Sequence, residues 1–193
     1  MDRKQPGVEL PLETERLLLR PFEASDLDDV ARLQGDAELV RWIPWGPRSR
    51  EEAKAVLERK MAKTAIGEGD GEDGLGVVAI LREEGSFLGE FTLSVVSAAD
   101  SCAEIGFMRL AGHHGRGYAT EGCRAILAAA FDGYGLHRVI ARVEPRNTAS
   151  CRVLERLGMR REAHFVENEW IKGEWQSEYT YAILAREWNA SKS

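Results

Sequence analysis

The sequence predicts one mixed α/β domain, and three observations support this prediction. Two segments with helical spacing of apolar residues come early, and β-rich runs follow from Leu75. A glycine-rich stretch then stands between an apolar run and another helical segment. Because neither an internal repeat nor an inter-domain linker interrupts this order, residues 1–193 are expected to form a single domain.

The N-terminal part predicts a short strand and two helices. Residues 14–22 read as a strand closed by a proline. Ser25 is a plausible N-cap for a helix that Gly35 ends, because apolar residues recur between them at helical spacing. Ser49 is placed to cap a second helix over residues 50–65, whose composition strongly favours helix.

A meander of strands is predicted next. The acidic, glycine-rich segment 67–74 resembles a calcium loop only superficially, since alternating ligands and a downstream glutamate are missing, so it reads as a solvated loop. Three β-rich runs then indicate antiparallel strands, at residues 76–83, 86–96 and 103–110. The remaining expected elements are a helix over 119–131, a strand over 137–144, a helix over 148–157, and closing strands over 159–171 and 174–188 joined by a turn at Lys172 and Gly173.

Composition narrows the function classes. A formal net charge of −6 argues against nucleic acid as the main partner and permits an amine substrate. The sequence has no stretch of 18 apolar residues and no signal-peptide pattern at its start, so no membrane partner is expected. Its three cysteines are odd in number and widely spaced, which favours a reducing, cytoplasmic location.

The stretch "LAGHHGRGYATEG", residues 110–122, is the most informative part of the chain. An apolar run, a glycine-rich turn and a helix in succession can bind phosphate, because the first amides of a helix lack intrahelical partners. The alternative is a helix cap that needs glycine for close packing. The nucleotide P-loop and dinucleotide fingerprints are absent. A metal site is disfavoured, because His113 and His114 are adjacent and their side chains diverge.

The residues from His114 to Ala119, "HGRGYA", resemble the [Q/R]-x-x-G-x-[G/A] pyrophosphate loop of GCN5-related N-acetyltransferases (GNAT). His114 departs from the usual first residue. The continuation "GRGYATEG", the downstream "EPRNTASCRVLERLGM" and the opening "LETERLLLRPFEASD" are similar to the RimJ/RimL branch, which acetylates the N-termini of ribosomal proteins. The resemblance covers the chain from Leu12 to about Trp188.

The resemblance implies the GNAT fold and acetyl-CoA as co-substrate, without a metal. In that fold, a mixed and mostly antiparallel sheet is flanked by helices and opens between two parallel strands, here those ending near Leu110 and Glu144. The pantetheine arm would pair with this strand backbone, and Asn147 would orient the coenzyme arm or nearby backbone. An amide at Phe107 or Met108 would polarise the acetyl carbonyl. The residues implied to contact the coenzyme are Phe107, Met108, Arg109, Leu110, His114, Gly115, Arg116, Gly117, Tyr118, Ala119, Thr120 and Asn147.

The family reaction implies a base for the amine and an acid for the leaving thiolate. Many members use a tyrosine as the acid, but Leu154 stands at that position here. Ser150, one helical turn earlier, is the expected replacement, unless its hydroxyl only satisfies local backbone groups. Among Glu162, Glu167 and Glu169, alternation puts the last two on one strand face, and Glu169 is the expected base.

The acceptor is left open between two kinds of amine. An α-amine with a pKa of about 7.7–8.0 is roughly one tenth neutral at pH 7, whereas a lysine amine at about 10.4 is below roughly one thousandth. A site without an obvious strong base therefore favours a protein or peptide α-amine over lysine, with a small amine such as an amino sugar, amino acid or antibiotic as the alternative. A non-catalytic acyl-CoA-binding module is a third hypothesis. Trp42 and Trp45 are expected to form an acceptor wall or to pack ordinarily, and homodimers are common in the family.

Overall fold

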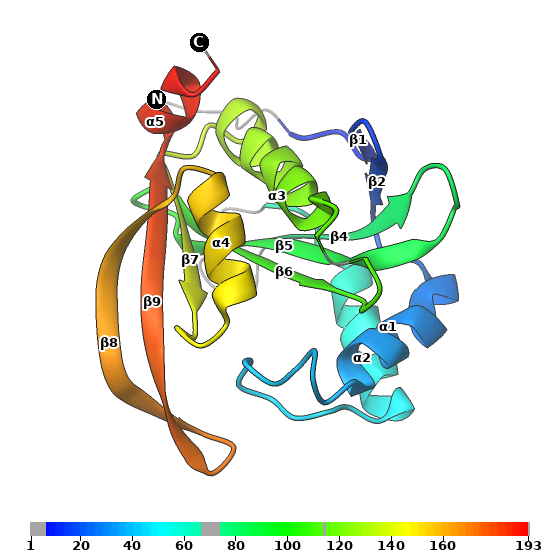
Figure 1. Ribbon diagram of the computed structural model, residues 1–193. Helices are drawn as coiled ribbons and strands as arrows, with labels where there is room; N and C mark the ends of the chain where they lie inside the picture. Colours follow the sequence, from blue (N-terminus) through cyan, green and yellow to red (C-terminus); the bar gives the residue numbers. More distant parts are fainter. Residues whose placement is uncertain (1–6, 67–73, 114, 193) are drawn as a thin grey trace.

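The computed structural model describes residues 7–66, 74–113 and 115–192 (Figure 1). Residues 67–73 of the loop predicted over 67–74, and His114, which departs from the family motif, therefore lie outside the described residues. Gly74 is the first residue of a strand. One sheet runs in the order β1-β2-β4-β5-β6-β7-β9-β8, with β3 pairing β4 at the side. Its strands are β1 (Leu12–Glu13), β2 (Leu17–Arg20), β3 (Thr64–Ala65), β4 (Gly74–Leu81), β5 (Phe87–Ser97), β6 (Cys102–Arg109), β7 (Arg138–Val143), β8 (Arg160–Ile171) and β9 (Glu174–Leu184).

Helices cover both faces of this sheet, because its strands are apolar on both sides. In β4, Val77 and Ala79 belong to one hydrophobic core, and Val78 between them belongs to the other. Since neighbouring strand residues point to opposite faces, the two cores lie on opposite sides of the sheet. The first core packs under α3 (Tyr118–Ala128) and α4 (Thr148–Arg156), and the second under α1 (Leu27–Gly35) and α2 (Arg50–Met61).

The sheet opens between its two parallel strands. β6 and β7 pair in parallel from Cys102 with Arg138 to Glu104 with Ile140, and there the ladder ends. β6 continues to Arg109 on the β5 side, while β7 continues to Val143 on the β9 side. The predicted mixed α/β fold, mostly antiparallel with an opening between these strands, is confirmed.

The N-terminal prediction was correct for the start of the second helix and partly wrong for the first. The second helix ends at Met61 rather than at residue 65, because Thr64 and Ala65 form β3 on the edge of β4. Ser49 caps α2 as predicted, accepting from Glu52 N while the Glu52 carboxylate accepts from Ser49 N. Ser25 is not an N-cap, because a 3-10 turn (Ala24–Asp26) precedes α1. Asp26 stands at the N-cap of α1, but its side chain makes no capping bond to that helix. Its carboxylate instead accepts from Glu23 N at 2.8 Å, as part of a capping box on the 3-10 turn, and pairs with Arg20.

The end of the chain also differs from the prediction. The closing strand stops at Leu184, and α5 (Ala185–Ala190) replaces the strand expected up to Trp188. The carboxylate of Glu187 accepts from Leu184 N at 2.8 Å, which starts the helix, and the Trp188 ring packs against Phe131 at 5.9 Å between centroids. Local capping and burial of an aromatic ring thus outweigh the β-rich pattern. None of the described helices is long and apolar enough to cross a membrane.

Candidate active site

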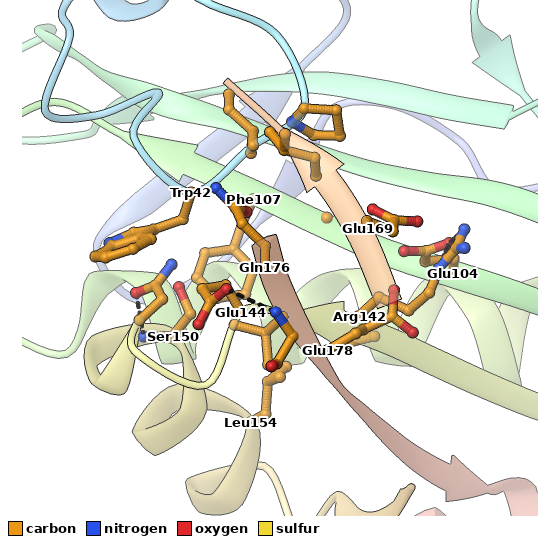
Figure 2. Close-up of a pocket in the computed structure, with 18 of the residues that line it drawn as sticks. Trp42, Glu104, Phe107, Arg142, Glu144, Ser150, Leu154, Glu169, Gln176 and Glu178 are labelled. Carbon is orange, nitrogen blue, oxygen red and sulfur yellow. Dashed lines mark hydrogen bonds and ion pairs between the residues drawn. The ribbon is translucent and has the colours of Figure 1, made fainter. Parts of the chain in front are cut away.

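A cavity of about 370 Å³, here called the splay pocket, occupies the opening between β6 and β7 (Figure 2). Its walls come from both strands, from α4, from the β8–β9 hairpin and from the loop between α1 and α2. Because α4 covers one face of the sheet and the α1–α2 loop lies toward the other, the pocket connects the two faces. Figure 2 shows Glu104, Arg142 and Glu169 at one side of it, and Trp42, Glu144 and Ser150 at the other.

Three strands bring charged side chains together at this opening. Ile105, Ala141 and Tyr179 face the α3–α4 core, so alternation turns their neighbours Glu104, Arg142 and Glu178 to the opposite face. Arg142 Nη2 lies 2.6 Å from Glu104 Oε2, and this hydrogen bond raises the pKa of Arg142. The side chains of Glu104 and Arg142 are thereby held in place beside Glu178.

Glu178 is a half-buried carboxyl of this group, and its pKa is raised above the ordinary value. Burial raises its pKa, a hydrogen bond from Thr180 and the charge of Arg142 oppose the rise, and the charges of Glu169 and Glu104 add to it. A half-buried carboxyl with a raised pKa is a better proton acceptor near neutral pH than a solvated one. Sequence reasoning missed Glu104, Arg142 and Glu178; the period-2 pattern of their strands was the available signal.

Glu169 lines the splay pocket, but Glu167 does not share its position. The β8–β9 register shifts between Phe165 and Glu169, where four residues of β8 span two of β9. Glu167 has a φ of 49° and donates its backbone N–H to Ser177 Oγ. Both Asn168 and Glu169 consequently line the pocket, so the predicted alternation of Glu167 with Glu169 on one face is wrong. Glu162 lies elsewhere, in ion pairs with Arg138 and Arg160.

A buried carboxylate, Glu144, organises the far end of the pocket. It accepts hydrogen bonds from the backbone and guanidinium of Arg146 and from Ser177 N. Burial alone would raise the pKa of Glu144, but these hydrogen bonds outweigh it and lower the pKa. Glu144 is therefore an ionised structural group that ties the end of β7 to β9.

The first turn of α4 holds two of the predicted residues at the pocket wall. Asn147 is the N-cap, and its Oδ1 accepts from Ser150 N at 3.2 Å. Ser150 is half-buried and lines the pocket, and its hydroxyl makes no hydrogen bond within the described part of the chain. Leu154 lies one turn further on and is buried in the core. The Ser150 hydroxyl is thus available to a molecule in the pocket.

The glycine-rich loop leads into α3 through backbone that only glycine adopts easily. Gly115 and Gly117 have φ values of 76° and 81°, and Gly117 is the N-cap of the helix. Arg16 donates to Arg116 O, lies over the Tyr118 ring at 4.5 Å and pairs with the helical carboxylate Glu121. The loop is therefore fastened to the residue directly before β2, while the first amides of α3 lack intrahelical partners.

The surface beside this helix start suits a phosphate-bearing ligand. A groove of about 390 Å³ runs from Gly117 and Thr120 along the exposed side chains of Arg124 and Arg156. Its two carboxylates are Glu15 and Glu121, and the second is neutralised by Arg16. Two guanidiniums and the positive end of a helix are donors that phosphate accepts well. Ala119, in the first turn of α3, is buried, and a Cβ at Gly122 would lie 2.3 Å from the Phe91 ring. The buried face of α3 therefore packs closely on the sheet.

The end of β6 presents the strand edge that was expected to pair with a coenzyme arm. Phe107, Met108 and Arg109 lie beyond Glu104, where the parallel ladder has ended. Phe107 lines the splay pocket, Met108 packs toward the α1–α2 core, and Leu110 is buried in that core. From Phe107 to Arg109, the edge of β6 that faced β7 earlier in the strand therefore borders the opening.

Trp42 and Trp45 belong to two different cavities. Trp42 lines the splay pocket, and the guanidiniums of Arg41 and Arg146 lie over its ring at 4.5 and 4.9 Å from the centroid. Trp45 lines a separate cavity beneath α2, with Arg48 stacked on it at 3.7 Å. Neither residue belongs to the two buried cores. Among the described residues, no group of three or more potential ligands is arranged to hold a metal ion.

Comparisons with known proteins agree with this geometry. A profile described as "Acetyltransferase (GNAT) domain" matches residues 16–160. The Bacillus subtilis (strain 168) protein named "Uncharacterized N-acetyltransferase YnaD" is 35% identical over 178 residues, which cover 92% of this chain and 99% of the relative. The crystal structure of a GNAT-family acetyltransferase from Bacillus anthracis is 32% identical with a TM-score of 0.82, and the match covers 91% of this chain and 99% of that one.

A more distant structure shows the same fold. The spermidine N-acetyltransferase from Vibrio cholerae, solved in complex with CoA and spermine, has a TM-score of 0.77 at 20% identity, and the match covers 91% of this chain and 99% of that one. The finer assignment to the RimJ/RimL branch stays a prediction. The matched profile and the similar N-acetyltransferases show that the chain belongs to the GNAT family of N-acetyltransferases.

Proposed function

We propose that the protein transfers an acetyl group directly from acetyl-CoA to a primary amine bound in the splay pocket. The observation that carries this proposal is the pocket's position at the end of the parallel ladder. The pocket reaches the side of the sheet that carries the phosphate-suited groove, and it also reaches the side that carries the carboxylates. Donor and acceptor can therefore approach each other from opposite faces.

The coenzyme would be held by the loop and helix start on one side and by β6 on the other. The amides from Gly115 to Thr120, with Arg116, would bind its pyrophosphate. The edge of β6 from Phe107 to Leu110 would pair with its pantetheine arm, and an amide at Phe107 or Met108 would donate to the acetyl carbonyl. When bound, acetyl-CoA supplies the thioester that the amine attacks. His114 would be part of the same loop, and Asn147 would hold the start of α4 beside it.

The proton of the attacking amine would pass to a carboxylate of the pocket. Glu169 is the base proposed from the sequence, and Glu178 is a second carboxylate with a raised pKa beside it. Glu104 is already paired with Arg142 and would orient the group. The leaving thiolate would take a proton from the Ser150 hydroxyl, which is free of other hydrogen bonds among the described residues and would regain a proton from solvent at the same time.

We favour a protein or peptide α-amine as the acceptor, because its neutral fraction at pH 7 is larger than that of lysine. A small amine is the second candidate. Its support is the carboxylate-rich lining of the pocket, together with the fold that the chain shares with the spermidine N-acetyltransferase of Vibrio cholerae. The free, buried cysteines of the chain are compatible with action in the cytoplasm.

Release of free coenzyme A, measured with peptides and small amines in parallel, tests the proposal. We expect turnover with acetyl-CoA and at least one class of primary amine, and mass spectrometry should show an acetylated amine. Tight binding of acetyl-CoA without turnover of any amine would instead favour a non-catalytic module. The ratio of kcat/KM between a peptide α-amine and spermidine decides between the two acceptor classes.

A further inference from the structure

A second cavity, here called the basic pocket, lies beneath α2 on the same sheet face as the carboxylates. Its volume is about 650 Å³, and its cationic lining residues are Arg48, Arg59, Lys60 and Lys63. The basic pocket and the splay pocket share three lining residues, Ile43, Gly106 and Phe107. The two cavities therefore adjoin, and one molecule can occupy both.

Most of the positive charge in the basic pocket is not neutralised by the described residues. Lys60 pairs with the buried carboxylate of Glu90 at 2.5 Å. Within residues 7–66, 74–113 and 115–192, Arg48, Arg59 and Lys63 form no ion pair with a carboxylate. Four cations around one cavity with a single buried carboxylate leave a net positive lining.

Arg48 is fixed in this cavity by neutral groups. Its guanidinium stacks on the Trp45 ring at 3.7 Å and donates from Nη1 to Gln34 Oε1 at 2.7 Å, while its backbone N–H donates to Gln34 O. Gln34 is fully buried. Burial lowers the pKa of Arg48, and the charge of Arg59 lowers it further, while the charges of Glu90 and Glu52 only partly oppose the change. A positioned guanidinium that faces a second cation is an arrangement that a bound anion would relieve.

The splay pocket has the opposite character. Glu104, Glu169 and Glu178 line it around a single arginine, Arg142. The joined cavities are thus acidic where the reacting amine would lie and basic beneath α2. A ligand that complements both ends carries an amine at one end and an anionic group at the other.

We propose that the acetyl acceptor bears an anionic group, a carboxylate or a phosphate, which binds Arg48 and Arg59 in the basic pocket while its amine lies in the splay pocket. This inference rests on the proposed N-acetyl transfer and deepens it. A polyamine, which has no anionic group, would then be a poor acceptor.

Matched acceptors test the proposal directly. We expect kcat/KM for a dipeptide with a free C-terminal carboxylate to exceed that of its C-terminal amide by about tenfold to a hundredfold, the usual worth of a hydrogen bond to a charged group. Phosphoethanolamine compared with ethanolamine distinguishes phosphate from carboxylate as the anionic group. The preference should appear mainly in KM, since the anion lies away from the reacting atoms.

Substitutions in the basic pocket locate the effect. Arg48→Gln and, separately, the exposed Arg59→Gln should raise KM for the anionic acceptor and leave its neutral counterpart nearly unchanged. Lys54→Gln is the matched control, because Lys54 is an exposed cation of α2 that does not line the cavity. Equal loss for the charged and neutral acceptors would mean a structural effect and would overturn the assignment.

The failure of this inference differs from the failure of the proposed function. Acetylation of neutral amines or spermidine as efficiently as anionic amines would overturn the inference and leave the acetyl transfer standing. Binding of acetyl-CoA without acetylation of any acceptor would overturn both the inference and the proposed acetyl transfer. If the wild type prefers the anionic acceptor and Arg48→Gln loses that preference, the result supports both the inference and the proposed acetyl transfer.

Discussion

Gly117 shows how one residue joins the loop to the helix. Its φ of 81° at the N-cap of α3 strains a β-branched side chain by about 1–2 kcal/mol, although a Cβ would meet only Arg16 Nη2, at 3.5 Å. We predict that Gly117→Val weakens acetyl-CoA binding at least tenfold in calorimetry. Gly85→Val is the control, since Gly85 has a φ of 67° in the open β4–β5 turn. Comparable affinity in both variants would separate the loop from coenzyme binding.

Ser150 offers a prediction about the leaving group. Its hydroxyl lines the splay pocket and makes no hydrogen bond among the described residues, so it is placed to protonate a thiolate. Ser150→Ala should lower kcat by about 100-fold, the usual contribution of a general acid, with little change in acetyl-CoA affinity. The backbone contact of Ser150 N with Asn147 survives this substitution. Unchanged turnover would show that the thiolate needs no acid at this position.

Glu178 and Glu169 make different predictions for pH dependence. Burial and neighbouring carboxylates raise the pKa of Glu178, and a base works only when ionised, so activity should fall as pH drops through that raised pKa. With a weakly basic aromatic amine as acceptor, which stays neutral, this acid limb reports the enzyme carboxyl. Glu178→Gln should remove the limb. Glu169→Gln should shift it to lower pH, because the loss of a neighbouring charge lowers the pKa of Glu178.

The reverse result would identify the base as Glu169. In that case Glu169→Gln abolishes the acid limb while Glu178→Gln preserves it. Retention of the limb in both variants would exclude either carboxylate as the proton acceptor. Near-UV circular dichroism of each variant checks that the pocket is folded.

At the scale of elements, the β8–β9 hairpin closes the acceptor side through its turn. Lys172 and Gly173 have φ values of 52° and 83°, and Lys172 Nζ donates to Val40 O at 2.6 Å and to Arg41 O at 3.3 Å. These bonds fasten the hairpin to the loop that carries Trp42. The position of the Trp42 loop is therefore set by a turn between two strands that lies 132 residues further along the chain.

We predict that Lys172→Met loosens this fastening. The substitution keeps the aliphatic stem and removes two charge-assisted hydrogen bonds, so KM for the acceptor should rise about tenfold while acetyl-CoA affinity is unchanged. Lys54→Met, on the exposed surface of α2, controls for loss of a cation. An equal loss of acetyl-CoA affinity would mean that the hairpin supports the whole pocket rather than the acceptor side.

At the scale of the molecule, the sheet separates the tasks of the two faces. One hydrophobic core fastens α3 and α4 to one face, and the other fastens α1 and α2 to the opposite face. The opening between β6 and β7 is where the two sides meet. The separation allows the coenzyme side and the acceptor side to vary independently, which fits the wide range of acceptors that one family can serve.

The molecule also exposes an apolar surface on its edge hairpin, which extends away from the body in Figure 1. Phe165, Val166, Trp170 and Trp175 are between 49% and 68% exposed, and β8 is the last strand of the sheet. Because such an edge favours pairing with another chain, we predict a homodimer through this hairpin. Light scattering should give twice the chain mass for the wild type and less for Trp170→Ser. Val96→Ser, another exposed apolar site, should not change the mass, and a monomeric wild type would contradict the prediction.

The sequence by itself determined the family and the order of the main elements up to the last strand. Capping at Ser49, the meander after Leu75 and the glycine-rich loop before α3 are local signals, because each depends on neighbours within a few residues. The same locality explains the errors at Ser25 and at the last strand, where a carboxylate beside the expected cap and a tryptophan packed on a distant ring changed the outcome.

Only the tertiary structure decided the lining of the two cavities. Glu104, Arg142 and Glu178 come from three strands, and they meet because the strand register turns all three to one face. The irregular pairing of β8, which a period of two cannot anticipate, brings Asn168 and Glu169 to the same pocket. The acidic and basic cavities adjoin because of how the sheet, α2 and the Trp42 loop pack. Their linings come from segments far apart in the chain, so no single stretch of the sequence could predict that they adjoin.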